Sequence, residues 1–223
     1  MQVRIEGNQA NYLSRVMRVS ERDTVILCDN VTGEWAAMVV SASKREVVLE
    51  LVEQLKPREV VPDFMLCAAL LKKQAFDLVL EKATELGVAN IQPVITRRCV
   101  ADKLNMDRAR TIVTEAAEQC ARTALPQVQD PLKLDALLSG WPADRALFFA
   151  DELGGNPAPD SFAGHSAPAA LLIGPEGGFD DSEREAIRAH PQAVPISLGP
   201  RILRGETAAI AATALWMATR GDW

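Results

Sequence analysis

The chain has 223 residues, of which 48% are hydrophobic and 24% are charged, and its net charge at pH 7 is −6. These values are typical of a folded water-soluble protein with one or two domains. No apolar run approaches the roughly 20 residues that span a bilayer, and no apolar leader opens the chain. We therefore expect a cytoplasmic protein that does not associate with membranes.

The cysteines and histidines argue against a metal centre. The chain has only two histidines, and its four cysteines lie far apart, with no Cys-x-x-Cys pair. Zinc sites usually take about four such ligands at short spacings, so we expect no metal. We expect all four cysteines to be reduced thiols, namely Cys28, Cys67, Cys99 and Cys120.

The first sixty residues have the pattern of a small β domain. Residues 9–19 show a helical pattern, and we predict no strand before them. Turn residues over 29–33 predict a hairpin between the first two of three strand-like runs, 24–28, 34–40 and 46–52. The polar segment 56–62 contains two prolines and indicates a linker. We place the first domain at residues 1–59.

Strand and helix patterns alternate in the second domain, residues 63–223, and 154–168 is predicted to be a loop. Strands are predicted at 64–70, 91–95, 146–150, 169–173 and 194–198. Helices are predicted at 73–86, 107–123 and 206–220, with a further helix that starts at a Ser182–Glu185 capping box. Such alternation favours an α/β fold with a mostly parallel sheet and helices on both faces.

The helix expected after Asp107 has two distinct faces. Asp107 is the predicted N-cap, and Ile112, Ala116 and Cys120 form the predicted buried stripe. The opposite face carries Glu115, Gln119 and Arg122 at spacings of four and three residues, and spacing alone favours a solvated surface. The last helix, 206–220, is apolar almost all round, which predicts burial in a core or a subunit interface.

Two glycine-containing segments are the most informative part of the chain. Leu171–Phe179 (LLIGPEGGF) and Ile196–Ala208 (ISLGPRILRGETA) each run from a buried strand through Gly and Pro into a helix. Glycine lets the backbone approach a ligand closely, and open α/β sheets bind ligands at the carboxyl ends of their strands. The two turns therefore predict one binding crevice.

Common catalytic and nucleotide-binding motifs are absent. The chain has no Walker sequence, no GxGxxG, no GxSxG and no HExxH, which argues against a nucleotide-binding metabolic enzyme. Two alternatives stay open at the second turn. Arg201 and Arg204 could clamp a phosphate or carboxylate, or Arg204 could form an ion pair with Glu206 or Glu176.

Together these segments resemble the small-subunit ribosomal RNA methyltransferases of type E, in the SPOUT class of knotted methyltransferases. The strongest matches are the glycine segments 172–178 (LIGPEGG) and 198–204 (LGPRILR) with 206–208 (ETA), and 81–88 (EKATELGV), 115–120 (EAAEQC) and 11–18 (NYLSRVMR) support them. The resemblance implies a C-terminal trefoil-knot methyltransferase domain preceded by a small PUA-like β-barrel domain. It also implies a homodimer that uses S-adenosylmethionine to methylate uridine N3 in 16S rRNA of the small ribosomal subunit, at position 1498 by convention.

The resemblance also assigns roles to residues. It implies catalytic roles for Arg204 and Glu206, and RNA binding by Arg15, Arg18, Arg97 and Arg122. The implied cofactor-binding residues are Leu172, Ile173, Gly174, Pro175, Glu176, Gly177, Gly178, Ile196, Ser197, Leu198, Gly199, Ile202, Leu203, Thr207 and Ala208. Ala121 and Ala124 replace the family's usual Gly and Arg, which implies the loss of one phosphate contact. The alternative is a non-catalytic knotted protein that binds RNA or assists ribosome assembly.

Overall fold

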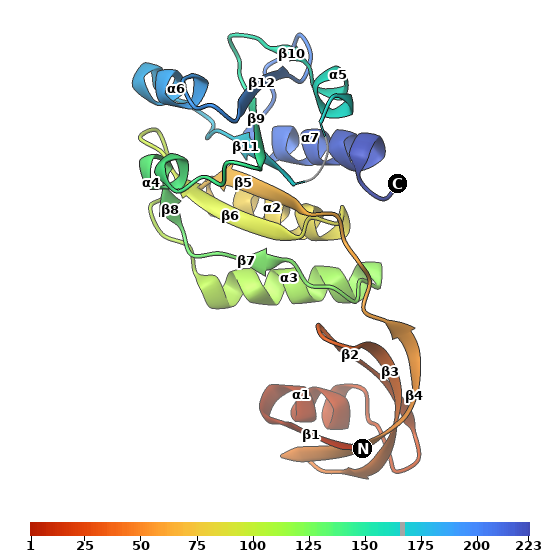
Figure 1. Ribbon diagram of the computed structural model, residues 1–223. Helices are drawn as coiled ribbons and strands as arrows, with labels where there is room; N and C mark the ends of the chain where they lie inside the picture. The colour runs from red at the N-terminus through yellow and green to blue at the C-terminus, as the bar shows by residue number, and fades with distance from the viewer. Residues whose placement is uncertain (166–167) are drawn as a thin grey trace. The chain divides into compact units, whose positions relative to one another are not determined.

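The computed structural model describes residues 1–165 and 168–223, which form two compact units, Met1–Val60 and Val61–Trp223. Figure 1 shows the elements of both units, and each unit has its own hydrophobic core. None of the helices in the described part of the chain is long and apolar enough to be a membrane-spanning segment.

The N-terminal unit is an antiparallel sheet of four strands with a helical segment. Its elements are β1 (Gln2–Glu6), α1 (Gly7–Asn11), the π-helix η1 (Tyr12–Val16), β2 (Thr24–Asp29), β3 (Gly33–Ala42) and β4 (Glu46–Pro57), and the sheet order is β1-β4-β3-β2. The predicted hairpin is present between β2 and β3. Register shifts between β3 and β4 mark bulges, which bend a sheet and increase its twist.

Strand β1 corrects the prediction that no strand precedes the helix. Its five residues alternate between exposed and half-buried positions, and they pair with β4 from Gln2 opposite Glu50 to Glu6 opposite Glu46. Only Val3 and Ile5 of this edge strand face the core, and polar residues occupy the positions between them. Two apolar residues are too few to give a clear strand pattern in the sequence. Ala10 of α1 is fully buried against that core.

The C-terminal unit is built on a parallel sheet, as predicted. Its strands are β5 (Phe64–Ala69), β6 (Asn90–Ile95), β7 (Gln127–Val128), β8 (Leu132–Lys133), β9 (Ala146–Ala150), β10 (Asn156–Pro157), β11 (Ala169–Ile173) and β12 (Ala193–Ser197). The sheet order is β10-β12-β9-β11-β5-β6-β7, and β8 also pairs with β6. Strand β9 therefore lies between β11 and β12, the two strands that lead into the glycine turns.

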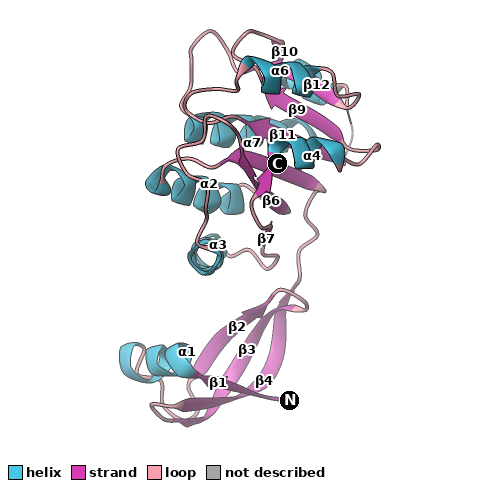
Figure 2. Ribbon diagram, turned by 90° about the vertical axis from the view of Figure 1, so that its left-hand side faces the viewer, coloured by secondary structure: helices cyan, strands magenta, loops and turns pink. Residues whose placement is uncertain are grey.

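Helices cover both faces of this sheet. The helices are α2 (Lys73–Glu85), α3 (Met106–Cys120), α4 (Leu134–Ser139), α5 (Ala158–Ala163), α6 (Asp181–Arg188) and α7 (Gly205–Arg220). Residues of α2, α3, α5 and α7 share one hydrophobic cluster, and residues of α4 and α6 belong to a second (Figures 1 and 2). The sheet separates the two clusters, because alternate residues of β5, β9 and β11 contribute to each.

Because of this alternation, only every second side chain of β11 lies on the face of the sheet that α7 covers. Leu171 and Ile173 belong to the cluster that contains α7, whereas Ala170 and Leu172 belong to the cluster of α4 and α6. Leu172 is fully buried in the second cluster, so its side chain is turned away from the face on which α7 packs. Leu172 could therefore contact a cofactor on the α7 side only through its backbone, and its role in cofactor binding stays a prediction.

The start of α3 and its buried face differ from prediction. Asn105 is the N-cap, since its side-chain oxygen accepts a hydrogen bond from the Arg108 N–H at 3.0 Å, and Asp107 lies exposed in the first turn. The buried residues are Ala109, Val113, Ala116 and Ala117, so of the predicted stripe only Ala116 is buried. Ala residues at 109 and 117 carry a weak hydrophobic signal, which is why the sequence pattern placed the stripe about one position away.

Two further predictions need correction. The capping box of α6 joins Asp180 to Glu183, two residues earlier in the chain than the predicted Ser182–Glu185 pair, although the spacing is the same. The predicted loop 154–168 contains β10 and α5, and its residues 166–167 lie outside the described residues. The short elements β7, β8 and α4 were also not predicted.

Candidate active site

A cavity of about 190 Å³ lies at the carboxyl ends of β9, β11 and β12. Its walls come from the segment after β9, the two glycine turns and the first residues of α7. Apolar side chains from the ends of β11 and β12 and from the second turn contribute Ile173, Ile196, Leu198, Ile202 and Leu203. The crevice predicted from the two glycine turns is therefore present as a single cavity.

Gly178 occupies a position that no other residue could take without rearrangement. Its φ of +66° is in the left-handed region, and a Cβ built there would lie 2.8 Å from Oε1 of Glu152. Gly177 is different, because its nearest side-chain neighbour, Cβ of Arg98, would be an ordinary 3.5 Å away. Gly178 lines the cavity, and Gly177 is absent from the cavity wall.

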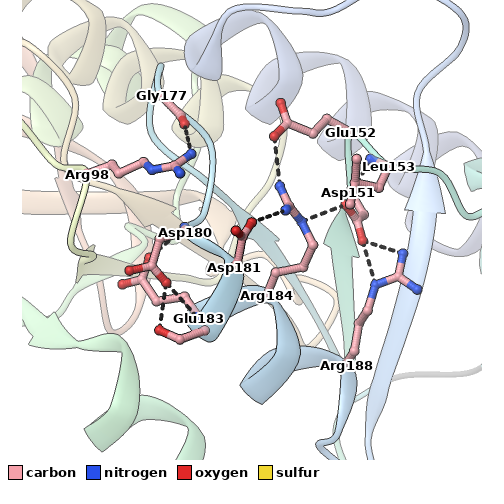
Figure 3. A network of polar contacts seen from close by, with 11 residues as sticks. Arg98, Asp151, Glu152, Leu153, Gly177, Asp180, Asp181, Glu183, Arg184 and Arg188 are labelled. Carbon is pink, nitrogen blue, oxygen red and sulfur yellow. Dashed lines mark hydrogen bonds and ion pairs between the residues drawn. The ribbon is translucent and has the colours of Figure 1, made fainter.

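A network of charged side chains includes three residues of the cavity wall, Asp151, Glu152 and Arg184 (Figure 3). Asp151, whose side chain is 1% exposed, accepts hydrogen bonds from Arg188 and forms an ion pair with Nε of Arg184 at 3.3 Å. Arg184 also contacts Oε1 of Glu152 at 2.7 Å and Oδ1 of Asp181 at 3.4 Å. In the part of the chain that the structure describes, no group of three or more His, Cys, Asp or Glu side chains is arranged to hold a metal ion.

A second set of contacts fixes the first glycine turn to α6 and to the segment after β6. Nη1 of Arg98 donates a hydrogen bond to the Gly177 carbonyl at 2.8 Å, and Nη1 of Arg97 contacts Oδ2 of Asp180 at 3.0 Å. The pKa of Asp180 is lowered to about 2, chiefly because the Glu183 N–H donates to its carboxylate, with Ser182 and Arg97 adding to the effect. Asp180 therefore stays ionised as the cap of α6 at neutral pH.

Comparison with known proteins identifies the family. The model of the RNA methyltransferase domain matches residues 58–217, and that of the RNA methyltransferase PUA domain matches residues 5–52. The ribosomal RNA small subunit methyltransferase E of Rickettsia conorii is 30% identical over 210 residues, which cover 93% of this chain and 85% of that protein. The chain belongs to this methyltransferase family. Its counterpart in Synechocystis is 32% identical over 92% of this chain and 69% of the relative.

Solved structures agree with this assignment and with the expected fold class of a PUA-like domain followed by a SPOUT methyltransferase domain. The enzyme of this family from Neisseria gonorrhoeae, bound to S-adenosylmethionine, has a TM-score of 0.90 at 27% identity and covers all of this chain and 94% of that one. A methyltransferase of Legionella pneumophila in complex with the same cofactor has a TM-score of 0.88 at 29% identity, with the same coverage.

The methyltransferase brings most of its predicted cofactor residues together around the cavity. Those that line it are Ile173, Gly174, Pro175, Glu176, Gly178, Ile196, Ser197, Leu198, Gly199, Ile202, Leu203 and Ala208. Leu172, Gly177 and Thr207 are absent from the wall. Leu172 faces the other layer, Gly177 is bound by Arg98, and Thr207 is exposed on α7.

The two predicted catalytic residues lie at the start of α7, beside the cavity and outside its wall. Arg204 is the N-cap residue and is exposed, while Glu206 is half-buried in the first turn. Neighbouring Leu203 and Gly205 line the cavity. Among the described residues no ion pair joins Arg204 to Glu206 or Glu176, which leaves its guanidinium available to a substrate.

The four arginines predicted to bind RNA have different surroundings. Arg15 and Arg18 are exposed, and Arg97 remains 68% exposed at its side chain although it contacts Asp180. Arg122 is buried, and its guanidinium donates hydrogen bonds to the carbonyls of Thr84 and Val88 at 2.6 and 3.2 Å. This placement corrects its prediction as a phosphate ligand, because Arg122 ties the end of α2 to the segment after α3.

The residues that follow β9 were not predicted as part of the site. Asp151, Glu152 and Gly154 line the cavity together with Arg184 of α6. A usable signal was present, since two carboxylates directly follow the predicted strand 146–150 at its carboxyl end. Arg184 gave no such signal, because it lies within a charged helix of ordinary composition.

Proposed function

We propose that this enzyme transfers a methyl group from S-adenosylmethionine to N3 of a uridine in 16S rRNA, at the position numbered 1498 by convention. The observation that carries the proposal is the single cavity formed by both glycine turns, in a chain whose relatives are named as methyltransferases of small-subunit rRNA. Its apolar wall suits adenine, and its glycine turns let backbone N–H and C=O groups reach the edge of that ring.

Residues at the start of α7 are placed to assist the reaction. S-adenosylmethionine supplies a methyl group on a sulfonium centre. Uridine N3 must lose its proton as the N–C bond forms and the C–S bond breaks, and Glu206 is the proposed acceptor of that proton. The Arg204 guanidinium stabilises the negative charge that develops over N3 and its two flanking carbonyl oxygens. Because N3 lies on the pairing edge of the base, the target uridine must be unpaired or flipped out.

Nucleoside mass spectrometry tests this function directly. Unmodified 16S rRNA, free or in small subunits, is incubated with the enzyme and a cofactor that carries a deuterated methyl group. The expected product is 3-methyluridine with the deuterium label at one position of the rRNA. Cofactor and RNA binding without any labelled nucleoside would instead favour the non-catalytic assembly factor.

Gly178→Ala is expected to lower the affinity for S-adenosylmethionine about tenfold or more. A Cβ at this positive φ adds roughly 1–2 kcal/mol of backbone strain and displaces the Glu152 carboxylate in the cavity wall. Gly177→Ala is the matched control, because its Cβ has room. Calorimetric titration measures both, and equal affinities for the two variants would show that Gly178 is dispensable for the cofactor.

RNA binding is proposed to depend on Arg15 and Arg18 of the N-terminal unit, with Arg97. Replacing Arg15 and Arg18 together with alanine should weaken rRNA binding. It should also reduce the slope of log K against log salt by about one for each arginine that contacts a phosphate. The control variant removes the same charge at Arg108 and Arg110 of α3, which form ion pairs within the chain. An unchanged slope for the first variant would place both arginines on a merely solvated surface.

We propose a homodimer that pairs through the outer face of α7. Leu215 and Ala218 of this helix are exposed, and Ile210, Ala211 and Ala214 are half-buried, so an apolar strip remains on its outer side. Light scattering is expected to give twice the chain mass of 24.2 kDa at micromolar concentration. Leu215→Lys should convert the dimer to a monomer, and a monomeric native protein would contradict the proposal.

A further inference from the structure

Glu152 is part of the cavity wall. It follows β9, the strand between β11 and β12, and its carboxylate lies beside Gly178 of the first glycine turn. It also occupies the space in which a side chain at Gly178 would stand, with Oε1 at 2.8 Å and Oε2 at 3.4 Å from the position of that Cβ. The carboxylate is therefore part of the inner surface that a ligand would contact.

The surrounding network holds this carboxylate in place. Arg184, which is buried, donates a hydrogen bond to Oε1 of Glu152 at 2.7 Å. Arg184 is itself held by the buried carboxylate of Asp151, which Arg188 also contacts. With Asp181 included, three carboxylates face two guanidinium groups, so the cluster has one negative charge in excess.

That excess charge is accessible at Glu152. Its side chain is 43% exposed, whereas that of Asp151 is 1% exposed. In the described part of the chain, Oε1 of Glu152 accepts the hydrogen bond from Arg184, and no hydrogen bond is made by Oε2. A charged, oriented acceptor with an unused oxygen is therefore directed at the cavity, and the partner that suits it is a hydrogen-bond donor.

We infer that Glu152 binds the ribose hydroxyls of the adenosyl cofactor and that Arg184 is its positioning residue, an inference that rests on the proposed function. The ribose joins adenine to the sulfonium, so it lies between the apolar wall that suits adenine and the reacting methyl group, and Glu152 offers a charged acceptor in the same cavity. A pair of neighbouring hydroxyls donates well to one carboxylate. The carboxylate of the cofactor's methionine part would be repelled by Glu152, and adenine suits the apolar wall.

Calorimetric titration with three ligands tests this assignment. S-adenosylhomocysteine contains both the ribose and the amino acid part, 5′-methylthioadenosine lacks the amino acid part, and the 2′,3′-dideoxy form of the latter also lacks both ribose hydroxyls. Glu152→Gln is expected to lower the affinity for the first two ligands by the same factor, about tenfold. The native enzyme should bind the dideoxy ligand more weakly than 5′-methylthioadenosine by a similar factor. The variant should bind these two ligands with almost equal affinity.

Controls separate a ligand contact from damage to the fold. Asp181→Asn removes another carboxylate partner of Arg184 that is absent from the cavity wall, and it should leave the ratios among the three affinities unchanged. Arg184→Lys should weaken binding of the two ligands that carry hydroxyls more than that of the dideoxy ligand. A variant that is partly unfolded would lose affinity equally for all three, so the differences between ligands carry the result.

Three results would overturn the inference. If Glu152→Gln weakens binding of S-adenosylhomocysteine alone, Glu152 contacts the cofactor's ammonium group. If the variant binds all three ligands as the native enzyme does, Glu152 makes no cofactor contact, and the proposed function still stands. If the native enzyme binds neither S-adenosylhomocysteine nor 5′-methylthioadenosine, the proposed function fails, and the inference fails with it.

Discussion

Arg204→Ala is expected to lower kcat for rRNA methylation by about 10²–10³-fold while the affinity for S-adenosylmethionine stays within a factor of two or so. The guanidinium is exposed at the N-cap of α7 and is absent from the cavity wall, so its removal leaves the cofactor's surroundings intact. Its proposed role is to stabilise charge that forms during transfer, and such a loss reduces kcat rather than binding. Single-turnover kinetics and calorimetry measure the two quantities separately.

Arg220 at the other end of α7 provides the matched control. It is also exposed, and Arg220→Ala removes the same charge from the same helix, so turnover should be almost unchanged. Near-normal turnover by Arg204→Ala would remove Arg204 from the mechanism and leave Glu206 as the better candidate. Loss of cofactor binding would instead mean that Arg204 supports the structure of the second glycine turn.

Trp216→Ala is expected to lower the free energy of unfolding of the C-terminal unit by about 3–5 kcal/mol. Trp216 is 1% exposed, and its ring stacks on Phe64 of β5 with centroids 4.0 Å apart and an interplanar angle of 17°. Its removal leaves a large cavity between α7 and the sheet. Urea denaturation followed by circular dichroism measures the change.

Trp223 is the control for this substitution, because it is 65% exposed and lies at the end of the chain. Trp223→Ala should alter the free energy of unfolding by no more than about 0.5 kcal/mol. If Trp216→Ala lowers the free energy of unfolding as little as Trp223→Ala does, this stacked pair does not hold α7 on the sheet. In that case most of the binding energy of α7 must come from its alanines and Met217.

The sequence predicted the parallel sheet and the binding crevice because both have strong local signals. Buried strands such as 169–173 are continuous apolar runs, and Gly and Pro mark the turns that follow them. Side-chain direction is a weaker signal. A one-residue difference in a strand changes the face of the sheet, so Leu172 and Ile173 have opposite surroundings although both belong to the same motif.

Long-range contacts could not be predicted from local pattern. Arg122 has the spacing of a solvated helix face, yet Ala121 adopts a left-handed φ of 57° at the end of α3 and the chain turns there. That turn places Arg122 among the carbonyls of α2 and Val88, which lie more than 30 residues earlier. The fully buried position of Ala124 follows from the same turn, so an arginine in its place would not be a surface residue.

The separate cores of the two units have a consequence for how denaturation data are interpreted. The N-terminal core draws on residues between Ile5 and Leu51, and both other cores draw on residues from Phe64 onward. A chain with independent cores need not melt in one cooperative transition, and then a single midpoint describes neither unit. Trp35 reports on the first unit, whereas Trp141 and Trp216 report on the second, so single-tryptophan variants would resolve the two transitions. Evolution can likewise tune the stability of the two units independently, since a destabilising change in one core leaves the other core's packing unaltered.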